Sequence, residues 1–141
     1  METRTNDSYV FTPSNAGEFT TRVLENVHLS TRYYLLRLAR PASFVEPLAG
    51  QFVHVMVPSP GATAGERFFL RRPFSIHDCT RDHIDLVIVE AGPGSQALRH
   101  TRAGDHVTFY GPLGQPYPVL PGKRVLGIGG GVGLAPLYFY G

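Results

Sequence analysis

Hydrophobic and polar residues alternate in short stretches between residues 18 and 110. Residues 50–57 alternate until Pro58 ends the stretch, although Phe52 and the polar Gln51 and His54 separate the two faces imperfectly. A period of two residues is typical of β-strands, and turn-forming residues separate the stretches. The pattern predicts six strands, within residues 18–27, 33–38, 50–57, 68–77, 84–89 and 106–110.

A single helical pattern interrupts these strands, at Ser95–His100, and Ser95 is the expected N-cap residue. The chain also contains 16 glycines and 12 prolines, which favours short strands joined by turns over a helical bundle. The predicted fold is therefore mainly β: a six-stranded antiparallel Greek-key barrel with one short helix.

The pattern changes after Pro121 and Gly122. Residues 123–128 form a continuous apolar run, which predicts a strand buried on both faces of a parallel sheet. We therefore expect a mobile tail at 1–16, a barrel domain at 17–118, and at 119–141 the first strand and turn of an incomplete α/β nucleotide-binding domain. With no sheet to join, the run from Lys123 is expected to be disordered or to pair with another copy or partner.

Composition narrows the classes of function. The net charge of +2 comes from scattered basic residues, which argues against nucleic acid as a partner, and no apolar run is long enough to cross a bilayer. The chain starts with polar residues and lacks a secretory signal pattern, so a cytoplasmic location is expected. Cys79 is the one cysteine, which excludes an internal disulfide and a cysteine-ligated cluster built from these 141 residues alone.

The segment Arg72–Ser75 is the first candidate for binding chemistry. The Arg72 guanidinium suits phosphate oxygens, and Pro73 removes a ladder hydrogen bond, which indicates an edge strand or a barrel opening where a ligand can lie. Phe74 adds an apolar ring and Ser75 a hydroxyl, a set that suits a flat heteroaromatic ring with a diphosphate tail. Taken alone, the segment is more typical of a surface arginine beside a core phenylalanine than of a ligand site.

Two glycine-rich segments could hold phosphates. Gly92–Ser95 exposes backbone N–H groups at the start of a helix, although an ordinary capped helix has the same pattern. Gly129–Pro136 follows the apolar run, as a nucleotide-binding turn does, but Val132 and Leu134 occupy the places of later glycines in Gly-x-Gly-x-x-Gly.

Other chemistry has little support in the sequence. His77, Cys79 and His83 could converge at a hairpin, but a solvated turn is the simpler interpretation, so no metal site is predicted. The chain has no P-loop, and no motif of a nucleophilic triad accompanies its histidines, so no catalytic side chain is assigned.

The order of the motifs resembles a known family. Residues 70–78, preceded by Gly50–Val53 and followed by Gly111–Gly114 and Gly129–Pro136, are similar to the electron-transfer subunit of NAD-dependent dihydroorotate dehydrogenase. This family lies within the ferredoxin–NADP reductase-like superfamily. The resemblance extends over about residues 18–141, and the combination of motifs is quite specific.

The resemblance implies a bound FAD and a set of residues that hold it. Arg72 would contact the FAD diphosphate, Pro73 and Phe74 would lie along the flavin and ribityl, and Ser75 would lie near the flavin N5. The full set of cofactor-binding residues expected from the resemblance is Arg72, Pro73, Phe74, Ser75, the strand backbone at Val87, Ile88 and Val89, the turn at Gly94 and Ser95, and, for NAD, Gly129, Gly130, Gly131 and Gly133.

The resemblance also implies partners and further cofactors. In the family, NADH reduces FAD, and electrons pass singly through a two-iron two-sulfur cluster to a catalytic FMN subunit that interconverts dihydroorotate and orotate in pyrimidine synthesis. A hetero-oligomer is therefore expected. The chain departs from the family pattern at Val89, where a basic residue is common, and it lacks both the cluster cysteines and most of the nicotinamide domain.

Two alternatives remain open from the sequence. A reductase subunit of another flavoprotein complex, serving a hydrogenase, a sulfur enzyme or an oxygenase, would use the same flavin residues. A barrel that serves as a docking or regulatory module would bind no flavin at all, and its purified form would be colourless.

Overall fold

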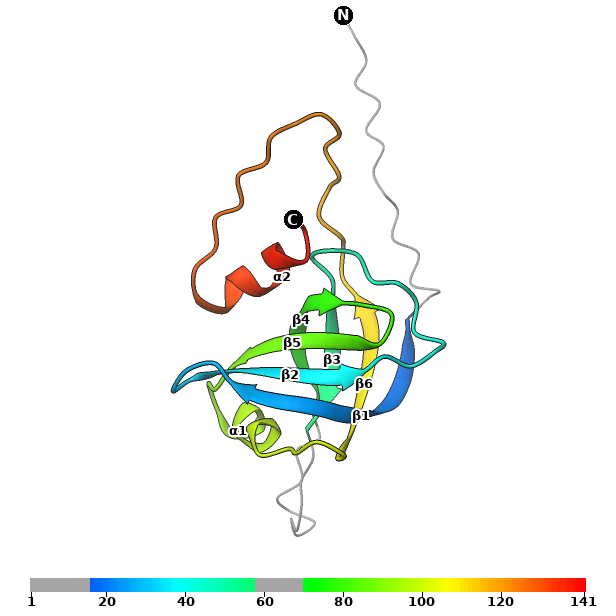
Figure 1. Ribbon diagram of the computed structural model, residues 1–141, viewed down its shortest axis with the longest axis vertical. Helices are drawn as coiled ribbons and strands as arrows, with labels where there is room; N and C mark the ends of the chain where they lie inside the picture. Colours follow the sequence, from blue (N-terminus) through cyan, green and yellow to red (C-terminus); the bar gives the residue numbers. More distant parts are fainter. Residues whose placement is uncertain (1–15, 58–69) are drawn as a thin grey trace, which may run out of the picture.

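A computed structural model describes residues 16–57 and 70–141, and six antiparallel strands in it close into a barrel (Figure 1). The hydrogen-bonded order around the barrel is β1-β2-β5-β4-β3-β6, and β6 returns to pair with β1. The predicted six-stranded antiparallel barrel is confirmed. Its strands are β1 (Gly17–His28), β2 (Tyr33–Ala39), β3 (Phe52–Met56), β4 (Arg72–Cys79), β5 (His83–Val89) and β6 (His106–Leu113).

The alternation in the sequence sets the barrel interior. In β2, every second side chain is buried, and Tyr34, Leu36 and Leu38 are almost completely inaccessible to water. The same period places Val53 and Val55 of β3 inside the barrel. Burial of these apolar side chains is the main source of stability for the closed barrel.

The helix α1 (Pro93–Arg99) begins earlier than the sequence predicted. Gly92, not Ser95, is the N-cap residue, and Pro93 occupies the first turn, where its fixed φ and missing N–H are favourable. The Ser95 side chain still stabilises the start of the helix from inside it. Its Oγ accepts hydrogen bonds from the N–H groups of Ala91 at 2.9 Å and Gly92 at 3.1 Å.

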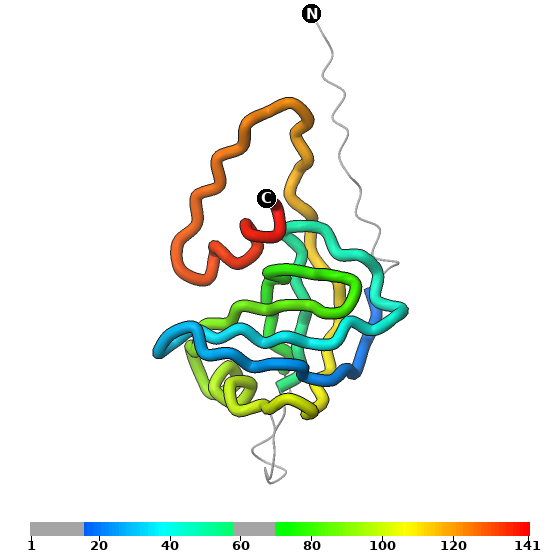
Figure 2. The backbone as a smooth tube through the Cα atoms, viewed as in Figure 1, coloured from blue at the N-terminus to red at the C-terminus, as the bar shows by residue number. Residues whose placement is uncertain are grey.

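The strand predicted at residues 123–128 is absent: this segment is an extended loop that arches away from the barrel and returns (Figure 2). A closed barrel offers no free edge, so the run has no strand to pair with. Leu126 and Ile128 are 84% and 86% exposed, as expected for an apolar run without a sheet. The chain then forms a 3-10 turn (Gly131–Leu134) and a short helix α2 (Ala135–Tyr138), which packs against β4.

Some predictions fall on parts of the chain that are not described. The mobile tail predicted at 1–16 lies outside the described residues except for Ala16, as does the predicted beginning of the fourth strand at residues 68–69. Within residues 16–57 and 70–141, no helix has the length and apolar character needed to cross a membrane.

Candidate functional site

The barrel is open along part of one seam, between β4 and β5. These strands pair only from Ile76, which faces Leu86, to Cys79, which faces Ile84. The first half of β4, residues 72–75, pairs with β3 alone, and residues 87–89 of β5 pair with β2 alone. The sequence left two settings open for this strand, an edge or a barrel opening, and the structure has the opening, on the β5 side of β4.

A cavity of about 460 Å³ fills this opening. Three segments that are distant in sequence line it: the first half of β4, the end of β5 with the turn into α1, and the glycine run near the C-terminus. Its lining residues are Arg72, Pro73, Phe74, Ser75, Val87, Val89, Ala91, Gly92, Pro93, Gly94, Ser95, Val132 and Gly133. Most of the predicted flavin residues are thus brought together.

Arg72 lies directly against the first turn of α1. A Cβ atom added at Gly94 would lie 3.4 Å from the Arg72 Nε, so the absent side chain of this glycine allows the guanidinium to approach closely. Among the described residues, Arg72 forms no ion pair with a carboxylate, and its Nη1 makes only a long 3.4 Å contact with the Leu70 carbonyl. Within residues 16–57 and 70–141, no carboxylate therefore neutralises this guanidinium.

Backbone donors of α1 lie beside the guanidinium. The first N–H groups of a helix have no intrahelical acceptor, and Gly94 and Ser95 occupy these positions after Pro93, which has no N–H. Gly94 is buried against Arg72 and Val57. An arginine and the first amides of a helix, side by side, form a suitable binding place for phosphate oxygens.

The rest of the cavity is apolar with one hydroxyl. Val87 and Val89 line it from β5, while Ile88 between them is completely buried in the barrel core, so only the backbone of Ile88 is near the opening. Phe74 and Ser75 line it from β4. Ser75 directly precedes the first β4–β5 pair, so the hydroxyl and Val87 lie where the strands part and Arg72 lies at the open end.

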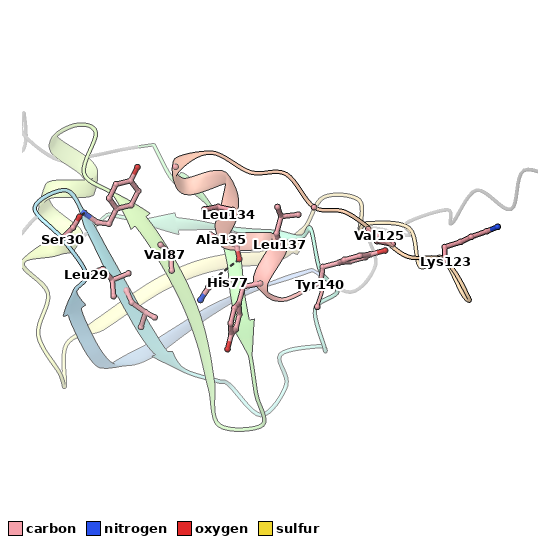
Figure 3. A pocket seen from close by; sticks show the side chains of 16 residues that line it. Leu29, Ser30, His77, Val87, Lys123, Val125, Leu134, Ala135, Leu137 and Tyr140 are labelled. Carbon is pink, nitrogen blue, oxygen red and sulfur yellow. Dashed lines mark hydrogen bonds between the residues drawn. The ribbon is translucent and has the colours of Figure 1, made fainter.

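The four predicted NAD-binding glycines do not gather at one place. Gly133 and Val132 line the cavity in the β4–β5 opening, whereas Gly131 lines a second cavity of about 1030 Å³ between the barrel and the C-terminal segment (Figure 3). Gly129 and Gly130 line neither cavity. Gly131 has φ of +56°, a conformation that favours glycine, and an added Cβ would lie 3.1 Å from the Tyr33 hydroxyl.

Sequence reasoning missed two lining residues, Ala91 and Val132. Ala91 directly precedes the Gly92–Ser95 turn, so its position next to a candidate segment was the available signal. Val132 was interpreted only as a departure from a glycine motif, and nothing in the local sequence indicates that the C-terminal segment folds back onto β4.

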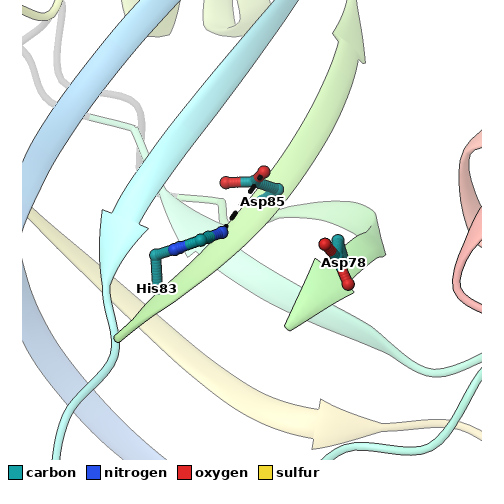
Figure 4. A group of neighbouring side chains, drawn as sticks. All are labelled: Asp78, His83 and Asp85. Atoms are coloured by element: carbon teal, nitrogen blue, oxygen red, sulfur yellow. Dashed lines mark ion pairs between the residues drawn. The ribbon is translucent and has the colours of Figure 1, made fainter. Parts of the chain in front are cut away.

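The three residues considered for a metal site are not brought together. The His77 Nδ1 donates to the Ala135 carbonyl at 2.9 Å, and Cys79 is buried. His83 instead lies near Asp78 and Asp85 (Figure 4). Asp85 is already paired, since Arg37 Nε and Nη2 each donate to one of its oxygens at 2.8 Å. The Asp85 carboxylate of this cluster is therefore held in an ion pair with Arg37.

The fold defines the class of this protein: it is a flavin-binding domain of the ferredoxin reductase-like type. The solved FAD/NAD-binding domain of nitric oxide dioxygenase from Vibrio cholerae O1 biovar El Tor has the same fold, with a TM-score of 0.73 at 22% identity, over 86% of this chain and 54% of that one. The profile of the oxidoreductase FAD-binding domain family matches residues 19–117. The chain belongs to this family.

Curated relatives carry a more specific name. The chain is 35% identical over 118 residues to the electron transfer subunit of dihydroorotate dehydrogenase B (NAD(+)) from Caldanaerobacter subterraneus subsp. tengcongensis, over 84% of this chain and 44% of the relative. The subunit of the same name from Shouchella clausii is 39% identical over 97 residues, over 65% of this chain and 36% of the relative. The chain thus spans less than half the length of these relatives.

Proposed function

We propose that this chain binds FAD in the β4–β5 opening, as the flavin-holding part of an electron-transfer subunit. The observation that carries the proposal is that the groups suited to a phosphate and the groups suited to a flat ring lie at opposite ends of the cavity. Arg72 and the amides of Gly94 and Ser95 lie at its open end, while Ser75 and Val87 lie where the strands part. A dinucleotide has its charged groups and its ring arranged in the same way, with a diphosphate at some distance from a flat ring.

Each part of the cavity has a separate role in this proposal. The Arg72 fork and the α1 amides would hold the diphosphate, and the valines of β5 would exclude water from the ring. Ser75 would hydrogen-bond to the ring and orient it, and the unpaired backbone of residues 72–75 offers further donors and acceptors. When bound, FAD supplies the ability to take a hydride from a nicotinamide and release electrons singly.

The names of the relatives extend the proposal to the whole protein. It would pass electrons between NADH and a catalytic, FMN-containing dihydroorotate dehydrogenase subunit in pyrimidine biosynthesis, as a cytoplasmic hetero-oligomer. Residues 17–118 would form the FAD-binding domain, and 119–141 would belong to the NAD-binding domain. The described residues do not fit a two-iron two-sulfur cluster, because their one cysteine is buried and burial raises its pKa to about 11.

The decisive test is FAD binding by the purified chain. We expect a yellow protein with absorption near ~450 nm, the band that the cofactor supplies. Arg72→Ala should weaken FAD binding by about 10- to 100-fold, since a hydrogen bond to a charged group contributes about 1.5–3 kcal/mol. Arg72→Lys should recover only part of the affinity, because an ammonium lacks the planar fork.

A matched control is Arg22→Ala, which removes an exposed arginine from β1, across the barrel from the opening. This variant should bind FAD with unchanged affinity in the same fluorescence titration. A folded wild-type chain that stays colourless in excess FAD would overturn the proposal and favour a docking module. Equal losses in the two arginine variants would show a general charge effect without a site at Arg72.

A further inference from the structure

The helix α1 contributes Gly94 and Ser95 to the cavity, but it has only seven residues. Helices this short are not stable alone, so tertiary contacts must set its position. Leu98 attaches the middle of the helix to the barrel core, where it is completely buried. An apolar contact holds the helix against the core but does not fix the position of the helix along the barrel. Directional contacts such as hydrogen bonds are needed to fix that position.

One such contact is made by the first turn of α1, the turn that lies next to Arg72. The Tyr34 side chain of β2 is completely buried, and its hydroxyl donates a hydrogen bond to the Ser95 carbonyl at 2.6 Å. Ser95 is in the first turn of α1, and Gly94, the residue before it, packs against the Arg72 side chain. Burial raises the pKa of the Tyr34 hydroxyl, so it stays protonated and remains a donor at neutral pH.

A second contact holds the other end of the helix. The Asn26 Nδ2 of β1 lies 3.1 Å from the carbonyl oxygens of Leu98 and Arg99 and 3.0 Å from that of Thr101. The last carbonyls of a helix lack intrahelical partners. The Asn26 amide supplies a donor to the Arg99 carbonyl, whereas the Leu98 carbonyl also accepts from the Thr101 N–H and hydroxyl. Together, Tyr34 and Asn26 attach both ends of α1 to the β1–β2 hairpin.

We propose that Tyr34 is a positioning residue for the FAD diphosphate: through the Ser95 carbonyl it sets the distance between the amides of the first turn of α1 and the Arg72 guanidinium. The inference rests on the proposed function, since it assigns a role within the same site. Tyr34 itself touches no ligand. It acts from the opposite side of the turn, so its removal should disturb the phosphates and leave the ring end of the cavity intact.

The test is Tyr34→Phe, which removes one oxygen and keeps the buried ring. The matched control is Thr21→Val, because the Thr21 hydroxyl also donates to a backbone carbonyl, that of Ala39, at 2.6 Å, but between β1 and β2. We expect Tyr34→Phe to raise the Kd for FAD by about fivefold to tenfold and to shift the phosphorus NMR signals of bound FAD. The visible spectrum of the bound flavin should not change.

The outcomes separate this inference from the proposed function. If wild-type protein binds no FAD, the proposed function fails first. If the wild type binds FAD and Tyr34→Phe matches Thr21→Val in both Kd and phosphorus signals, the positioning role is wrong while the site stands. Asn26→Ala is a second control, because it releases the other end of α1: phosphorus signals that shift in Asn26→Ala but not in Tyr34→Phe would also overturn the inference.

Discussion

At the scale of single residues, burial determines what Cys79 can do. Its side chain lies in the core at the end of β4, and loss of solvation raises the pKa of the thiol to about 11. The thiolate is the reactive and metal-binding form, and an unperturbed thiol has a pKa of about 8.5. In the folded protein at neutral pH, Cys79 is therefore a protonated, apolar core residue.

We predict that Cys79 reacts with a thiol reagent at least about tenfold more slowly in the folded protein than in urea at pH 8.5, where an unperturbed thiol is about half ionised. Because the folded-state pKa is raised, the contribution of Cys79 to stability is complete below the unfolded pKa and declines as the pH rises toward 11. Reaction rates measured with Ellman's reagent check this prediction. Equal rates in the two states would contradict it.

At the scale of elements, α2 is attached to the barrel through one histidine of β4. The His77 Nδ1 donates to the Ala135 carbonyl, and its ring stacks on Tyr138 with a centroid distance of 4.5 Å (Figure 3). A helix of four residues has no stability of its own, so these contacts together with the burial of Ala135 and Pro136 hold it. His77 follows two residues after Ser75 on the same strand, so the strand that lines the β4–β5 cavity also anchors the C-terminal segment.

We predict that His77→Ala loosens α2 without unfolding the barrel. Amide hydrogen exchange in residues 135–139 should become about tenfold faster, because a hydrogen bond and a stacked ring are lost, whereas exchange in β2 should not change. His106→Ala is the control, since it removes an exposed histidine from the start of β6. If exchange accelerates equally in β2 and α2, His77 stabilises the whole barrel and the prediction is wrong.

At the scale of the whole molecule, the barrel and the C-terminal segment differ in how they are stabilised. Ile84 is 1% exposed inside the barrel, whereas Leu126 and Ile128 point into solvent from the loop that arches away from it. The free energy of unfolding therefore comes from the barrel, and the apolar residues of the loop contribute almost nothing to it.

We predict that the double variant Leu126→Gln, Ile128→Gln unfolds within about 0.5 kcal/mol of the wild type, because exposed positions without partners are nearly neutral. Ile84→Ala should cost about 2–5 kcal/mol, since it leaves a cavity in the core. Urea denaturation of the three proteins measures both values. Destabilisation by the double variant comparable to that by Ile84→Ala would show that the loop packs in solution.

Most of the barrel could be predicted from the sequence, and part of the site could not. Alternation is a local property, so the strands and the inward side chains of β2 and β3 follow from it directly. The first turn of α1 was misplaced because Ser95 suits the N-cap position by type, whereas Pro93 determines the start of the helix by its backbone geometry. The strand predicted at residues 123–128 does not form, because a buried strand needs the free edge of a sheet to pair with. Whether such an edge exists is a property of the whole sheet and not of the local sequence.

The sequence alone determined the six strands, the arginine and glycine segments that line the β4–β5 cavity, and the family to which they point. Only the tertiary structure decided that β4 and β5 part before Ile76 on β4 and after Leu86 on β5, that Tyr34 and Asn26 hold α1 from the barrel side, and that Val132 returns to the opening. The physical reason is range: strand periodicity depends on neighbours two residues apart, whereas barrel closure and the docking of α1 depend on residues that meet across the whole chain.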